Sequence, residues 1–165
     1  MGPSRRPTSR AVAEVAVFLA DEQHLSVDAD DLVALARHVL EQEDVPDDME
    51  VALLLVDEET IASLNQRHLS GDGPTDVLAF PIDEPGETPP DVPAILGDVV
   101  LCPAIAAAQA PGLGREPHDE LRLLTVHGLL HLLGMDHADP HEERAMFGRT
   151  EELLTSYAAA RRSGS

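Results

Sequence analysis

The 165-residue sequence has no lysine, no tryptophan, a single cysteine and an aromatic content of only 2%. With so few aromatic side chains, no row of rings is available on which successive nucleobases could stack. The core must therefore be built from Leu, Val, Ala and Ile. The single Cys102 excludes an internal disulfide and fits a reducing compartment, and we interpret it as a buried core thiol.

Positive charge is also scarce, because 11 arginines stand against 31 acidic residues and the formal net charge is −20. The negative electrostatic field of such a surface repels polyanions at long range, so the composition argues against a general nucleic-acid binder. An RNA substrate would have to bind where arginines are concentrated locally. The arginines in or beside the segments described below are Arg67, Arg115, Arg122, Arg144 and Arg149.

Apolar residues make up 43% of the chain and occur in several separate runs, which is typical of one globular domain. No run approaches the ~20 apolar residues of a membrane span, so we expect a cytoplasmic protein without a membrane partner. Residues 1–10 are expected to be a disordered leader, residues 11–160 the single folded domain, and residues 161–165 a disordered tail.

The spacing of apolar residues predicts a mixture of strands and helices. Asp28 and Asp57 are expected to cap two helices, and Pro103 to begin another. Strands are predicted at 12–20, 49–56, 77–82 and 96–102, and the two longest later helices at 116–133 and 142–160. This alternation indicates an α/β or an α+β domain.

The strongest chemical signal is the run His127-Gly128-Leu129-Leu130-His131-Leu132-Leu133-Gly134-Met135-Asp136-His137. His127 and His131 are four residues apart on a predicted helix, so both imidazoles lie on one face. Gly134 can end the helix in a left-handed conformation, which lets the chain bring His137 to the same point. Three imidazoles leave the fourth position of a Zn²⁺ ion open, as in catalytic zinc sites. We therefore predict one zinc ion per chain in a metallohydrolase domain.

The same histidine spacing occurs in metzincin proteases, whose general base is a Glu directly after the first His. That position is Gly128 here, so the group that deprotonates the zinc-bound water in peptide hydrolysis is missing. A metallopeptidase stays an alternative only if the base comes from elsewhere. A third possibility, three unrelated histidines on a buried helix, requires their spacing and Gly134 to coincide by accident.

Two carboxylates are candidates for a catalytic role. Asp136 could orient a ligand imidazole or could be a solvated turn residue. Glu120 lies seven residues before His127, on roughly the same helix face, and could be a base, a support for a ligand or simply a first-turn acid favoured by the helix dipole. Four further histidines are interpreted as surface residues, His118 and His141, or as structural ones, His38 and His68.

Three blocks of the sequence resemble the YbeY endoribonucleases, the bacterial rRNA maturation factors. The first is the run from His127 to His137. The others are Leu64-Asn65 followed by Pro74-Thr75-Asp76-Val77-Leu78-Ala79-Phe80-Pro81, and Leu96-Gly97-Asp98-Val99-Val100. With their order and spacing, the resemblance covers residues 12–157.

The resemblance implies a single α+β domain with a small mixed sheet of about four strands. It also implies a zinc ion on His127, His131 and His137, and cleavage of single-stranded RNA. The implied processes are maturation of the 3′ end of 16S rRNA and ribosome quality control, with the small ribosomal subunit and the GTPase Era as partners. A non-catalytic ribosome-assembly factor stabilised by zinc is the alternative.

The chain departs from the family pattern at two positions. Leu69 stands where many members have an Arg after the Leu-Asn pair, and Ala79 replaces a Ser. Without that guanidinium, another arginine must bind phosphate, and the candidates are Arg67, Arg122 and Arg144. The sequence leaves open whether a metal-bound hydroxide or the neighbouring ribose 2′-OH attacks the phosphodiester.

Overall fold

The computed structural model describes residues 15–68, 76–84, 89, 92, 94–135 and 139–164. Within them the chain forms four strands and five α-helices. The elements are β1 (Ala16–Asp21), α1 (Ala29–Gln42), β2 (Met49–Leu55), α2 (Glu58–His68), β3 (Val77–Pro81), β4 (Ala94–Leu101), α3 (Pro103–Gln109), a 3-10 turn (Pro111–Leu113), α4 (Pro117–Leu132) and α5 (Pro140–Gly164). The predicted leader at 1–10 lies outside the described residues.

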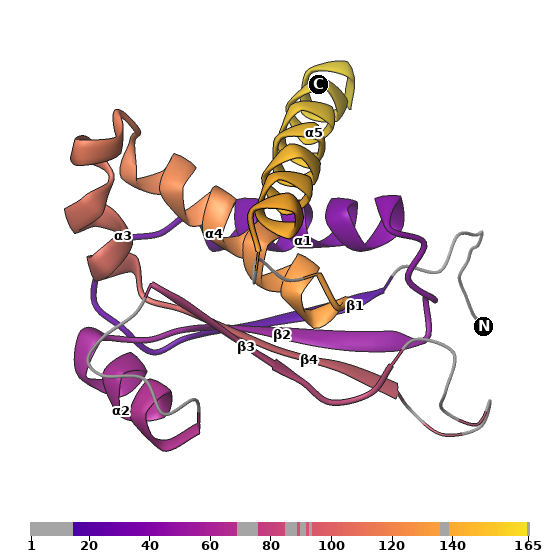
Figure 1. The fold of residues 1–165 in the computed structure, drawn as a ribbon, viewed down its shortest axis with the longest axis horizontal. Helices are drawn as coiled ribbons and strands as arrows, with labels where there is room; N and C mark the ends of the chain where they lie inside the picture. Colours follow the sequence, from indigo (N-terminus) through magenta and orange to yellow (C-terminus); the bar gives the residue numbers. More distant parts are fainter. Residues whose placement is uncertain are drawn as a thin grey trace, which may run out of the picture.

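The strands form one mixed sheet in the order β1-β2-β4-β3. β1, β2 and β4 run parallel, and β3 pairs antiparallel with β4 at the edge. Because parallel neighbours need a crossover connection, α1 links β1 to β2. Helices α1, α4 and α5 lie on one side of the sheet and α2 on the other (Figure 1). This arrangement confirms the predicted α+β class with a mixed four-stranded sheet.

Local signals set several boundaries where the sequence predicted them. The backbone N–H of Asp31 donates to the Asp28 carboxylate at 3.1 Å, and that of Thr60 donates to Asp57 at 2.8 Å. Both bonds satisfy donors that the first helical turn leaves unpaired. Pro103 is the first residue of α3, where a missing N–H costs nothing. The predictions of both caps and of this helix start are confirmed.

Aliphatic side chains fill the core, as the scarcity of aromatic residues predicted. Strand β2 alternates buried and half-buried residues, and α4 packs between the sheet, α1, α3 and α5. Cys102 is fully buried among apolar neighbours, which confirms its interpretation as a core thiol. None of the helices in the described ranges combines the length and the apolar character needed to cross a membrane.

Helix α5 continues through Arg161 to Gly164, so the tail predicted from residue 161 is helical up to Gly164. The physical reason is a tertiary contact: Arg161 forms an ion pair with Asp31 of α1, 130 residues away in sequence. A prediction from the helix propensities of neighbouring residues takes no account of a contact between residues so far apart in the sequence. His118, predicted to be a surface residue, is a half-buried residue of α4, and its Nε2 lies 2.6 Å from the same Asp31 carboxylate.

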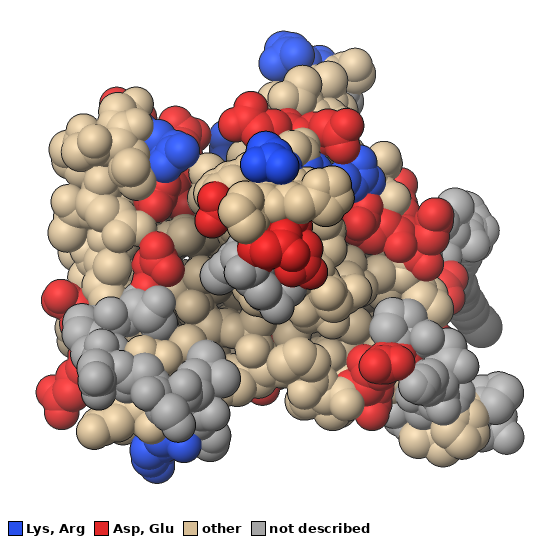
Figure 2. All heavy atoms as spheres, in the orientation of Figure 1, with Lys and Arg blue, Asp and Glu red and all other residues tan. Residues whose placement is uncertain are grey.

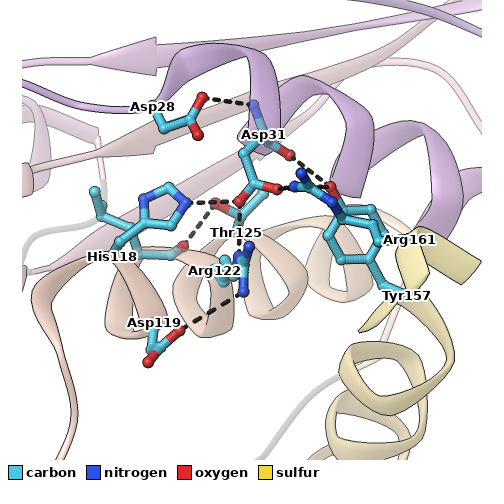
Figure 3. A network of polar contacts seen from close by, with 9 residues as sticks. Asp28, Asp31, His118, Asp119, Arg122, Thr125, Tyr157 and Arg161 are labelled. Atoms are coloured by element: carbon cyan, nitrogen blue, oxygen red, sulfur yellow. Dashed lines mark hydrogen bonds and ion pairs between the residues drawn. The ribbon is translucent and has the colours of Figure 1, made fainter. Parts of the chain in front are cut away.

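The Asp31 carboxylate joins three helices (Figure 3). Besides Arg161 and His118, it accepts hydrogen bonds from Arg122 Nε and from the Tyr157 hydroxyl, each at 2.7 Å. Burial alone would raise the pKa of Asp31, but the hydrogen bonds from Arg122, Tyr157 and His118 outweigh burial and hold the pKa well below its usual range. Asp31 is therefore an ionised, buried link between α1, α4 and α5.

Candidate functional site

His127 and His131 lie one turn apart on α4, are both half-buried, and line the same cavity of about 870 Å³. The cavity lies between α4, β3, α3 and the start of α5. It appears as a hollow in the face shown in Figure 2, flanked by acidic side chains. The predicted placement of these two imidazoles on one helix face is confirmed.

Helix α4 ends where the sequence predicted. Gly134 adopts a left-handed conformation with φ of 97°, and the backbone N–H of Met135 returns to the carbonyl oxygen of Leu130 at 3.0 Å. The next residues, including Asp136 and His137, lie outside the described residues, as does Leu69. The described residues therefore contain two of the three predicted ligands and no complete cluster of three metal-binding side chains.

The two imidazoles that are present fit the predicted metal. Histidines at i and i+4 on one helix can reach a single ion, and imidazole is a preferred zinc donor. Their cavity is large enough to admit a substrate, which a closed structural site does not require. The ring of Phe147 on α5 packs edge-on against His127 with the centroids 5.4 Å apart, so it limits how this imidazole can turn.

Gly128, between the two histidines, faces the sheet at close range. A Cβ atom there would lie 2.5 Å from Cγ1 of Val99 and 3.2 Å from Cγ2 of Val77. The position that carries the general base in metzincins therefore has no room for a side chain in this fold. The structure gives a packing reason for the glycine from which the sequence argued against a peptidase.

A chain of polar side chains forms another part of the cavity wall. Glu120 is almost fully buried, and its two oxygens accept hydrogen bonds from Arg115 at 3.0 Å and from Gln109 at 2.8 Å. The same Gln109 nitrogen donates to Asp76 at 2.8 Å. Glu120 thus shares the cavity with His127, as their spacing predicted. Its oxygens are engaged by neighbouring side chains rather than directed at the histidines.

The three arginines predicted as substrate contacts are not brought together. Arg122 is bound to Asp31 and lines a second, smaller cavity, which shares Arg115 and Leu123 with the cavity of the histidines. Arg67 on α2 and Arg144 on α5 are exposed, and neither lines the cavity that contains the histidines. The arginine that the structure places there is Arg115, two residues before the start of α4. The position of Arg115 beside the helix that carries the histidines was a weak indication in the sequence that it lines the cavity. Nothing in the sequence indicated that Phe147 does.

Among the comparisons with known proteins, the family model and the named relatives agree on one family. A family model described as Endoribonuclease YbeY matches residues 18–158. Endoribonuclease YbeY of Salinispora tropica is 50% identical over 155 residues, which cover 89% of this chain and 99% of that protein. The protein of that name from Acidothermus cellulolyticus is 51% identical over 153 residues, covering 88% and 93%. A solution structure of a protein from Thermotoga maritima has a TM-score of 0.58 and 28% identity, covering 90% and 93%.

Proposed function

The chain belongs to the YbeY endoribonuclease family, and from this premise we propose that it is a zinc-dependent enzyme that cleaves single-stranded RNA at the α4 cavity. The observation that carries the proposal is the pair His127 and His131 on the wall of one open cavity. His137 would complete the ligand set from the turn after the helix. The relatives' name supports RNA as the substrate class.

The proposed cellular role is the maturation of ribosomal RNA, including the 3′ end of 16S rRNA, and ribosome quality control. This role requires the enzyme to meet the small ribosomal subunit in the cytoplasm, and the GTPase Era is the further partner we propose. The family membership supports this assignment. Cleavage confined to single strands would restrict the enzyme to unpaired rRNA segments.

A zinc ion held by the three imidazoles would supply a Lewis acid for a phosphodiester oxygen. Residues of the chain around the proposed zinc position determine how α4 packs, how the His127 ring is oriented and which polar groups face the cavity. Gly128 has no side chain, which lets α4 lie close against the sheet beside His127. Phe147 restricts the His127 ring, and Glu120 and Gln109 build a fixed polar wall two helical turns away. The substrate is thus bound between a rigid helix and a half-exposed aromatic ring.

The test compares one RNA sequence as a single strand and as a duplex. We expect the zinc-loaded protein to cleave the single strand and to leave the duplex intact. A folded His127→Ala variant, checked by circular dichroism, is expected to lose cleavage. If that variant cleaves at the wild-type rate, the cavity is not the active site. If it supports ribosome maturation without RNA cleavage by any form of the protein, the protein is a non-catalytic assembly factor.

The product termini identify the attacking group in the same experiment. A 2′,3′-cyclic phosphate requires attack by the neighbouring ribose 2′-OH, whereas a 3′-OH and a 5′-phosphate require attack by water. Cleavage of an unstructured protein that disappears with His131→Ala would instead favour a metallopeptidase.

A further inference from the structure

We infer that Arg115 binds a backbone phosphate of single-stranded RNA in the cavity, and that the buried Glu120 holds its guanidinium in place. The inference rests on the proposed function, because it assigns a substrate contact in the same cavity. It also answers the question raised by Leu69, namely which arginine binds phosphate in this chain.

Arg115 is the sole arginine among the described residues that line the cavity. Three carboxylates, Asp76, Glu120 and Glu143, line the same cavity, and the whole chain carries a net charge of −20. RNA that enters such a cavity meets repulsion, so a fixed cation on the wall has a large effect on binding. Arg115 therefore supplies positive charge in a cavity wall where carboxylates would otherwise repel a phosphate.

The guanidinium is oriented but not buried. Its NH1 donates to Glu120 at 3.0 Å, and the Arg115 side chain is 37% exposed whereas that of Glu120 is 3% exposed. Gln109 holds the other Glu120 oxygen, so the carboxylate cannot rotate freely. A guanidinium carries five N–H donors in a fixed plane, which leaves donors for a phosphate after the bond to Glu120 is made.

The position of Arg115 indicates that it takes part in binding the RNA strand and not in the cleavage step. Its partner Glu120 precedes His127 by seven residues on α4, which corresponds to a rise of ~10 Å. A phosphate bound by Arg115 is therefore not the one at the histidines. We expect Arg115 to set the register of the RNA strand and to affect KM more than kcat.

The competing explanation is that Arg115 only neutralises the buried Glu120. Replacing Arg115 alone does not separate the two, because it leaves an uncompensated buried carboxylate and destabilises the fold. The informative comparison is between Glu120→Gln and the double variant Glu120→Gln/Arg115→Gln. Neither contains a buried charge at position 120, and they differ only in the guanidinium.

The measurement is the binding of a single-stranded 2′-O-methyl RNA oligonucleotide to zinc-loaded protein, by fluorescence anisotropy over a series of salt concentrations. Each phosphate contact of a single strand contributes about 0.7 to the slope of log K against log salt. We expect the double variant to have a slope smaller by about 0.7 than Glu120→Gln, and an affinity lower by roughly tenfold or more. The matched control is Glu120→Gln/Arg162→Gln, which removes the same charge at an exposed position near the end of α5.

The outcomes separate this inference from the proposed function. Equal slopes and affinities in Glu120→Gln and the double variant overturn the role of Arg115 while RNA binding by the protein stands. The same loss in the Arg162 control also overturns it, because the effect would then be one of net charge. Failure of every variant and of the wild type to bind RNA overturns both. Zinc content and unfolding midpoints, measured in each variant, confirm that the comparison concerns folded, loaded protein.

Discussion

A Cβ atom on Gly128 would lie 2.5 Å from Cγ1 of Val99, a separation that two carbon atoms of different residues do not adopt. Val99 is fully buried on β4 and cannot move aside without disturbing the core. The missing side chain is what allows α4 to lie directly on the sheet. Because His127 and His131 flank this glycine, the same contact fixes the height of both imidazoles above β4.

Gly128→Ala is expected to lower the free energy of unfolding by about 1–3 kcal/mol, the usual cost of overpacking a rigid core. The measurement is urea denaturation at neutral pH. Gly148→Ala is the matched control, because Gly148 is also helical but has open space around it. Since alanine favours helix, Gly148→Ala should leave stability unchanged or raise it by up to ~1 kcal/mol. Equal stability of Gly128→Ala and the wild type would show that the close contact does not exist.

His131→Ala is expected to lose zinc without losing the fold. His131 is only half-buried, so its removal leaves the core intact while it removes one of the three proposed ligands. The measurement is metal content after dialysis against a weak chelator, with circular dichroism as the check on folding. His24→Ala, which alters an exposed histidine, should keep its metal. Full zinc occupancy in His131→Ala would place the metal elsewhere.

Asp31→Asn is expected to destabilise the protein at neutral pH and to destabilise it less as the pH falls below about 4. The depressed pKa of Asp31 means that its ionised form is favoured in the folded state. Its stabilisation is therefore fully present above the unfolded carboxyl pKa of about 4 and is lost as the pH falls toward the lower folded value. At pH 7 we expect a loss of about 2–3 kcal/mol, at or below the lower end for a buried pair, because Arg122 and Arg161 are partly exposed.

Urea unfolding of the wild type and Asp31→Asn between pH 7 and pH 3 measures this effect. The difference in unfolding free energy should shrink as the pH falls below 4. A difference that stays constant over this range would mean that the Asp31 charge does not stabilise the junction of α1, α4 and α5.

Cys102 is expected to be unreactive in the folded protein. It is fully buried, and burial raises the pKa of its thiol, so little thiolate forms at neutral pH. A thiol reagent such as DTNB should label the protein at once in denaturant and slowly under native conditions. Rapid labelling of the native protein would show that the beginning of α3 unfolds locally and exposes Cys102 to solvent.

Local chemistry in the sequence is enough to predict several elements and the placement of two candidate site residues on one helix face. Asp28, Asp57 and Pro103 act through bonds within one helical turn, so a single sequence contains the whole signal. The same holds for His127 and His131, whose four-residue spacing alone puts them on one face.

The sequence did not predict contacts that packing creates between distant segments. Asp31 bonds to Arg161 across 130 residues, and His127 meets Phe147 through the docking of α5 on α4. Neither pair has a periodic or local signature. For this reason the sequence predicts a tail from residue 161, where the structure has helix, and a phosphate contact for Arg122, whose Nε donates to Asp31 in the structure.

The most direct test of the account is cleavage of a single-stranded RNA by the purified protein before chelation, after chelation and after zinc is restored. The account predicts one zinc ion per chain, loss of cleavage when the metal is removed, and recovery when it is returned. Protein that carries no zinc and cleaves RNA equally well in the presence of a chelator would contradict the central claim.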